Sequence, residues 1–246
     1  MKLLAFETAT EACSVAVWVD GQVIERFEIA PRRHAELALP WAEQLLAEAG
    51  IARRELDAIA VGRGPGAFTG VRLAVAICQG IALALDRPVL PVSTLLALAS
   101  QASGTHVLAA IDARMGEVYS AAYARNVSDR GSRLHAVTDE VVGAPEAVVL
   151  PGMPLHAPGI WQGIGTGFAA DQGVLASHLQ AQLQRIDAQA LPHAADVARL
   201  AAAAFDRGEA IAADQLEPAY LRNNVALTTR EQQALRAAKR ETGSAT

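Results

Sequence analysis

Residues 56–85 read LDAIAVGRGPGAFTGVRLAVAICQGIALAL, and the fold of the first half of the chain depends on this stretch. Its first six residues are mostly apolar and β-forming, which predicts a strand. The glycines and the proline at 62–66 predict a turn that reverses the chain. The apolar run from about 69 to 85 then predicts a long helix, one side of which lies on the sheet.

The helix predicted at 69–85 has apolar residues on all sides, and its main polar interruptions are Arg72 and Gln79. Such a composition is typical of a helix buried on every face. The run is too short and too interrupted to predict a membrane span. Two interpretations stay open: a layer helix covered by the second half of the chain, and a helix interface with another protein. Small residues at four-residue spacing favour close helix approach, on stripes made of Gly70, Ala74, Cys78 and Ala82 and of Ala76, Gly80 and Ala84.

The segments around this unit predict the rest of a first α/β half. Three β-forming runs precede it, at 3–6, 14–19 and 23–27. Asp20-Gly21 between the last two predicts a hairpin. Helical spacing from Ala38 to Ala49 predicts a helix that begins near Pro40 or is kinked there. A strand at 88–92 completes the order βββαβαβ.

A second half begins near residue 105 and opens in the same way, with strands predicted at 107–112 and 117–123. Ala/Leu-rich segments at 174–184 and 194–206 predict helices. We therefore expect three parts, an N-terminal unit at 1–100, a C-terminal unit at 101–222 and a polar tail at 223–246.

Composition excludes several classes of protein. The chain has 246 residues, 52% of them apolar and 19% charged, which excludes a disordered protein or a collagen. The net charge is −5, so the chain lacks the excess of basic residues that is typical of a protein that binds nucleic acid by itself. The N-terminal residues do not form a signal peptide, so we expect a cytoplasmic protein. Cys13 and Cys78 are expected to pack as small apolar residues.

Few motifs for chemistry are present. Residues 62–67 fit G-x-G-x-x-A, but hairpin strands precede them and Pro65 lacks an N–H for a pyrophosphate. The six histidines are scattered without metal-ligand spacing, and there is no phosphate-binding P-loop or G-x-S-x-G elbow. The turn at 7–10, Glu-Thr-Ala-Thr, resembles the phosphate-binding turn of actin-like ATPases, and it is equally typical of a polar β-turn.

The segment GPGAFTGVR at 64–72 resembles the hallmark of the TsaB (YeaZ) family. The resemblance extends over most of the chain, through Glu7-Thr8, His34 with Pro40, IDARMGEVY at 111–119, the turn at 165–167 and PAYLR at 218–222. It implies an actin-like ATPase (ASKHA) fold, α/β with two βββαβαβ-type subdomains. It also implies a role in making threonylcarbamoyladenosine at position 37 of tRNAs.

The resemblance further implies a noncatalytic scaffold rather than an enzyme. The catalytic TsaD relatives carry an H-x-x-x-H metal pair, and those places fall here on about Thr94 and Leu98, neither of which is a strong metal ligand. Without that pair the chain is not expected to perform the metal-dependent transfer alone. A vestigial nucleotide site would involve Glu7, Thr8, Gly165 and Gly167, with ATP or ADP bound only in a full complex.

The family implies partners as well: a TsaD-like catalytic subunit in a heterodimer, a TsaE-like ATPase in a larger complex, and a homodimer when the chain is alone. No membrane is implied, and contact with tRNA is indirect. The helices at about 34–49 and 69–85 would supply the partner surface. Its expected residues are His34, Leu37, Trp41, Leu45, Thr69, Arg72, Leu73, Ala76, Ile77, Gly80 and Ala84.

One function of another class stays open. The chain could be a self-sufficient actin-like phosphotransferase or hydrolase that binds ATP through Glu7, Thr8 and residues 165–167. This is the weaker hypothesis, because the sequence near Glu7 has no convincing phosphate-binding lysine and no second acid.

Overall fold

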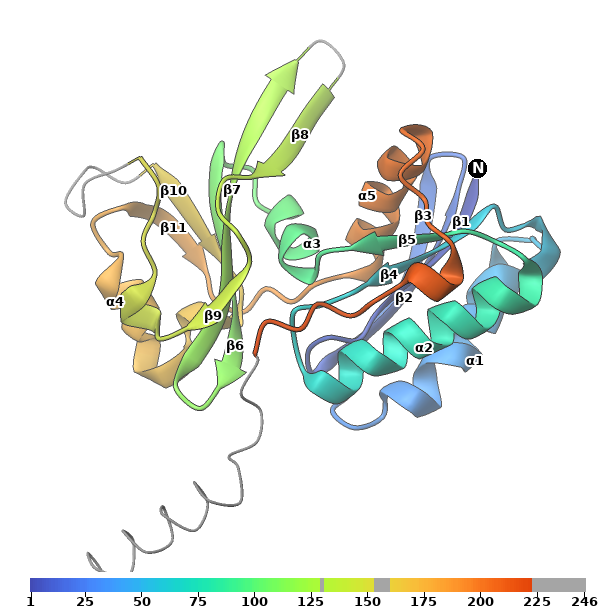
Figure 1. The fold of residues 1–246 in the computed structure, drawn as a ribbon, viewed down its shortest axis with the longest axis horizontal. Coiled ribbons are helices and arrows are strands. Elements are labelled where there is room, and N and C mark those ends of the chain that lie inside the picture. The colour runs from blue at the N-terminus through green and yellow to red at the C-terminus, as the bar shows by residue number, and fades with distance from the viewer. Residues whose placement is uncertain (129–130, 153–159, 223–246) are drawn as a thin grey trace, which may run out of the picture.

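The computed structural model describes residues 1–128, 131–152 and 160–222, which form two mixed α/β units side by side (Figure 1). The first unit is a five-stranded sheet in the order β3-β2-β1-β4-β5. The first three strands are antiparallel neighbours, whereas β4 and β5 run parallel to β1. The strands are β1 (Lys2–Glu7), β2 (Ala12–Val19), β3 (Gln22–Ile29), β4 (Ala58–Gly62) and β5 (Val89–Val92).

Helices cover both faces of the first sheet (Figure 1). Because side chains alternate along a strand, Leu4 and Phe6 of β1 point to one face, and Leu3 and Ala5 point to the other. The helices α1 (His34–Glu48) and α2 (Phe68–Leu85) pack on the first of these faces, and α5 (Ala194–Asp206) packs on the second. Although α5 follows the second unit in sequence, it belongs to the core of the first sheet.

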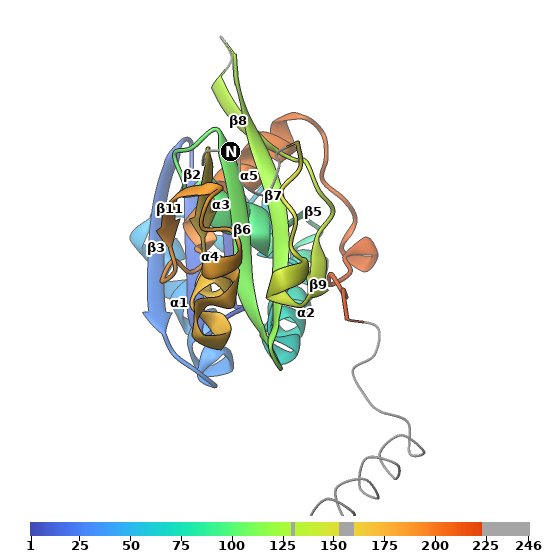
Figure 2. The same cartoon turned by 90° about the vertical axis from the view of Figure 1, so that its left-hand side faces the viewer.

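The second unit is a sheet in the order β11-β10-β6-β7-β8, with β9 paired to β7. Helix α3 (Thr94–Ser100) packs on one face through Leu95 and Leu98, and α4 (Val174–His178) packs on the other through Leu175 (Figure 2). Its strands are β6 (His106–Arg114), β7 (Glu117–Ser128), β8 (Gly131–Ala136), β9 (Val141–Gly143), β10 (Trp161–Ile164) and β11 (Leu183–Asp187). Short 3₁₀ turns occur at η1 (Arg53–Glu55), η2 (Pro145–Ala147), η3 (Thr166–Phe168), η4 (Ala170–Gly173) and η5 (Ala213–Gln215).

The elements expected in the first unit are confirmed in order and type. Asp20 and Gly21 both have positive φ, which suits the tight hairpin between β2 and β3. Helix α1 begins at His34 and continues through Pro40. This proline faces solvent, so water can satisfy the carbonyl group that lacks its helical hydrogen bond.

The second unit departs from the predicted pattern. The helix expected at 174–184 ends at His178, and its last residues belong instead to β11. Parallel pairing with β10 supplies backbone hydrogen bonds that outweigh the helix propensity of this segment. Between β8 and β10 the described residues form β9 and η2 and no α-helix, so the order βββαβαβ is not confirmed for this unit. The expected tail at 223–246 lies outside the described residues.

By length and composition alone, α2 is long and apolar enough to cross a membrane. No other helix among the described residues meets these two criteria. The expectation that the stretch is too short is therefore wrong, because the helix starts at Phe68 and reaches 18 residues. In this structure α2 lies along the first sheet as one layer of the fold (Figure 1).

Candidate functional site

One side of α2 is apolar and open to solvent. The side that faces the sheet is buried and consists of Gly70, Val71, Ala74, Val75, Cys78 and Ala82. The opposite side is exposed and consists of Thr69, Arg72, Ala76, Gly80, Leu83 and Ala84. The Leu83 residue is 67% exposed to solvent. Of the two interpretations, a layer helix covered by the second half of the chain is therefore wrong, because the second unit does not cover α2 (Figure 1).

A groove between α1 and α2 continues this apolar surface. It has a volume of about 250 Å³, and its walls include Leu39, Leu46, Ile81 and Leu85. Leu39 is 48% exposed at its edge. Contiguous exposed apolar surface of this kind marks an interaction site. We call the exposed side of α2 together with this groove the α1–α2 face.

The predicted interface residues do not all lie on one surface in the structure. Leu37 and Trp41 are half-buried on α1 and do not line the groove, Leu73 and Ile77 are half-buried on α2, and the predicted residues of α2 named above lie on the α1–α2 face. Leu45 is 1% exposed and packs in the core, so it is not available to a partner. The half-buried His34 lines the cleft described below, where its Nε2 lies 3.0 Å from the carbonyl oxygen of Thr10.

Substitution of Gly80 tests whether this glycine lies on an open surface of α2 or in a close contact within the protein. A Cβ at this position would meet nothing within 4 Å. Because glycine weakens a helix by about 1 kcal/mol relative to alanine, Gly80→Ala is expected to raise the free energy of unfolding by about 0.5–1 kcal/mol in urea denaturation. Gly70→Ala is the matched opposite, since its Cβ would lie 2.0 Å from the carbonyl oxygen of Thr8, and it should lower stability. A Gly80→Ala protein less stable than the wild type would contradict the open surface.

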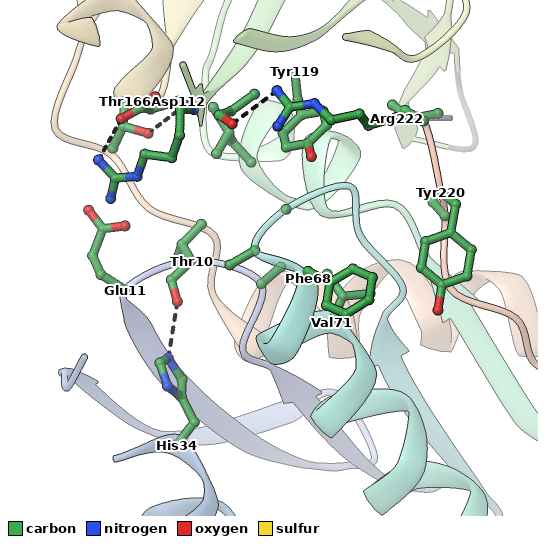
Figure 3. Close-up of a pocket in the computed structure, with 18 of the residues that line it drawn as sticks. Thr10, Glu11, His34, Phe68, Val71, Asp112, Tyr119, Thr166, Tyr220 and Arg222 are labelled. Carbon is green, nitrogen blue, oxygen red and sulfur yellow. Dashed lines mark hydrogen bonds and ion pairs between the residues drawn. The ribbon is translucent and has the colours of Figure 1, made fainter. Parts of the chain in front are cut away.

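A cleft of about 450 Å³ lies between the two units (Figure 3). The first unit contributes Thr10 and Glu11 from the β1–β2 turn, His34 from the start of α1 and Phe68 from the start of α2. The second unit contributes the side chains of Asp112, Arg114, Tyr119 and Thr166, and residues 219–222 close one side. Glu7, Thr8, Gly165 and Gly167 do not line this cleft.

Glu7 and Thr8 lie in the protein interior and join segments to one another. The Glu7 side chain accepts hydrogen bonds from the Ala9 N–H at 2.7 Å and from the Thr94 hydroxyl at 2.9 Å. Burial raises the pKa of the Glu7 carboxyl to about 7. The Thr8 hydroxyl donates to the carbonyl oxygen of Gly70 at 2.7 Å. These side chains fasten the turn after β1 to α2 and α3, and they do not face open space where a phosphate could bind.

Gly165 and Gly167 permit a close approach of η3 to β6. A Cβ on Gly165 would lie 2.3 Å from the carbonyl oxygen of Ala110, and the φ of this glycine is +109°. A Cβ on Gly167 would lie 2.7 Å from the Ala110 Cβ. Thr166 between them reaches the cleft, and its hydroxyl accepts a hydrogen bond from the Asp112 N–H at 3.2 Å. The four residues expected to form a nucleotide site are thus not brought to one cavity.

Thr94 and Leu98, where the metal pair of the catalytic relatives is expected to fall, lie in the protein interior. Thr94 and Leu98 are fully buried on α3, where Leu98 packs against the second sheet. No group of three or more His, Cys, Asp or Glu side chains that could hold a metal ion occurs in the part of the chain that the structure describes.

Ser14, Glu25 and His193 meet at the start of α5, yet their geometry is not that of a hydrolase triad. The Ser14 hydroxyl donates to the Glu25 carboxylate at 2.6 Å, and the His193 ring lies 3.0 Å from the other carboxylate oxygen. In a triad the imidazole would stand between hydroxyl and carboxylate. Here Glu25 also accepts the Ala195 N–H, so the group anchors the N-terminus of α5 to β3.

Sequence reasoning missed the contribution of Tyr220. Its hydroxyl accepts a hydrogen bond of 2.7 Å from Arg72 Nε, and the Arg72 guanidinium stacks 3.5 Å from the centre of the Phe68 ring. The resemblance drew attention to the segment 218–222 but gave it no role. No local pattern brings together residues that are 148 positions apart.

Comparisons with known proteins show the family of this chain. The family model of tRNA N6-adenosine threonylcarbamoyltransferase, TsaD, matches residues 27–229. The tRNA threonylcarbamoyladenosine biosynthesis protein TsaB of Escherichia coli K12 is 43% identical, over 92% of this chain and 96% of that protein. TsaB of Haemophilus influenzae is 39% identical, over 92% and 95%. A solved structure of YeaZ from Pseudomonas aeruginosa superposes with a TM-score of 0.76 at 44% identity, covering 89% of this chain and 99% of that one.

The fold and the site define a mixed α/β protein of two sheets that fits the actin-like type and carries an exposed apolar helix face. Two relatives that match this chain over nearly their whole lengths are named as threonylcarbamoyladenosine biosynthesis proteins. The chain belongs to the TsaB (YeaZ) family.

Proposed function

We propose that this chain is a noncatalytic scaffold and dimerisation subunit of the complex that makes threonylcarbamoyladenosine at position 37 of tRNA. It binds and supports a TsaD-like catalytic subunit through the α1–α2 face. The observation that carries the proposal is the apolar side of α2, which is exposed along most of the helix. Burial of such a surface in an interface releases free energy in proportion to the apolar area removed from water.

We also propose that this subunit is not catalytic. The positions of the metal-binding pair hold a buried threonine and a buried leucine, and Glu7 is enclosed by protein. A self-sufficient phosphotransferase would need Glu7 and Thr8 in contact with a bound nucleotide, whereas both side chains are engaged with the backbone and with Thr94. We therefore assign the chain no cofactor of its own, and place ATP or ADP only in the full complex.

The remaining partners follow from the same assignment. A TsaE-like ATPase would join the larger complex, and the isolated chain would pair with a second copy through the α1–α2 face. The transferase subunit would make the direct contact with tRNA, because this chain has a net charge of −5. The two sheets correspond to the two actin-like subdomains, and the complex would act in the cytoplasm, where its tRNA substrate is found.

A reconstituted modification reaction tests the proposal. Purified transferase, its other protein components and unmodified tRNA are incubated with and without this chain, and the modified nucleoside is quantified by mass spectrometry after digestion of the tRNA. We expect the product to fall to the background level when the chain is omitted. Equal product in both reactions would show that the assignment is wrong.

A further inference from the structure

The last described residues form a strap that ties α2 to the second unit. We call residues 213–222 the C-terminal strap. The Gln79 side chain of α2 donates to the carbonyl oxygens of Ala213 and Leu216, each at 3.1 Å. The Arg222 guanidinium then bonds to the β6–β7 hairpin, through the carbonyl oxygen of Ala113 at 3.2 Å and through the Glu117 carboxylate. Figure 1 shows this strap running from the middle of α2 toward β6.

Between these two anchors the strap presents Tyr220 to Arg72. Arg72 is exposed on the first turns of α2, one helical turn before Ala76, and therefore lies on the α1–α2 face. Its guanidinium is held by the Phe68 ring at 3.5 Å, the Tyr220 ring at 5.2 Å and the hydrogen bond from Nε to the Tyr220 hydroxyl. Phe68 and Tyr220 are themselves 50% and 51% exposed, and both line the cleft (Figure 3).

Within residues 1–128, 131–152 and 160–222, this arrangement leaves a defined part of the Arg72 guanidinium without a hydrogen-bond partner. Because Nε is bonded to Tyr220, the two terminal nitrogens remain, and they form the end of the fork that binds a carboxylate with two parallel hydrogen bonds. Among the described residues no acid forms an ion pair with Arg72, and the first turn of α2 contains no acidic residue. The helix dipole makes this end of α2 still more positive.

A partner that covers the α1–α2 face must also cover Arg72, since Arg72 and Ala76 share one stripe. Arg72 is the one charged residue of α2. A guanidinium that loses its water without gaining an acidic partner weakens binding, because its desolvation is not compensated. We propose that the C-terminal strap presets Arg72, through Tyr220, to receive a carboxylate of the TsaD-like subunit. The inference rests on the proposed function and adds that the strap is a specificity-determining part of the interface.

Binding of the wild-type chain and three variants to the TsaD-like subunit, measured by calorimetry at low and high salt, tests this inference. Arg72→Gln is expected to weaken binding by about tenfold at low salt and to reduce the salt dependence of the affinity. Tyr220→Phe keeps the ring but removes the acceptor of Nε, so we expect a loss of about two- to fivefold. Tyr119→Phe is the matched control, because Tyr119 lines the same cleft on β7 and should leave the affinity unchanged.

A charge exchange provides the readout that a loss of local structure cannot imitate. Arg72→Glu should abolish binding, and changing the facing acid of the transferase subunit to arginine should restore it. If the wild type binds and the Arg72 and Tyr220 variants bind equally well at every salt concentration, this inference fails while the proposed function stands. If the wild type does not bind, the proposed function itself fails. Variants that weaken only self-association would assign the strap to a second copy and overturn the inference.

Discussion

Ala76→Arg is expected to reduce binding of the TsaD-like subunit by at least about a hundredfold, because it places a charge at the centre of the α1–α2 face. Ala76 is exposed between Arg72 and Gly80, where a second helix would approach most closely. A long charged side chain there would hold the helices apart and would lose its water without an acidic partner. The effect is measured by pull-down and by calorimetry against the purified transferase subunit.

The folded state should tolerate this substitution. Arginine has nearly the helix propensity of alanine, and the side chain at position 76 points away from the sheet. The matched control is Ala203→Arg, an exposed alanine on α5, which covers the opposite face of the same sheet. We expect the control to bind the transferase as the wild type does, and both variants to keep the wild-type circular dichroism spectrum. Ala76→Arg protein that is folded and still binds would exclude this face as the interface.

The surplus of apolar residues in α2 could be recognised from the sequence, whereas the surroundings of Glu7 and Thr8 could not, for a physical reason. Apolar residues around a whole helix exceed what one sheet can cover, so the surplus in α2 indicates an interface before any coordinates are known. Composition and helical spacing cannot tell which apolar residues of one helix are fully buried and which are partly exposed. Leu45 fits the helical period of α1 as well as Trp41 does, yet it packs into the core.

The predicted nucleotide residues show the opposite case. Glu7 and Thr8 resemble a phosphate-binding turn by residue type, and residue type alone does not say which way a side chain points. Their hydrogen bonds lead to Thr94 and Gly70, which are more than 60 residues away in sequence. The same is true of Arg72 and Tyr220, whose contact depends on the path of the C-terminal strap. Sites made by such distant contacts need the tertiary structure.

Glu7 should make the stability of the protein fall as pH rises from about 4.5 to about 7. Burial raises the pKa of its carboxyl from 4.5 to about 7 in the folded protein. Between these values the folded state holds a proton that the unfolded chain has released, so the stabilisation is complete below pH 4.5 and is lost as pH rises through about 7. The shift corresponds to about 3 kcal/mol of unfolding free energy. Urea denaturation followed by circular dichroism between pH 4.5 and 8 measures it.

Glu7→Gln isolates this contribution, because glutamine has the shape of the protonated acid and does not titrate. The hydrogen bond of Glu25 raises the pKa of His193, so this imidazole also loses stabilising charge as pH rises, but it does so in both proteins and cancels in the difference. We expect the wild type to lose about 3 kcal/mol relative to the variant over this range. Parallel pH profiles would mean that Glu7 is ionised at no cost in the folded protein. In that case the enclosure that argues against a nucleotide at this turn would be incomplete, and the phosphotransferase hypothesis would regain its strongest residue.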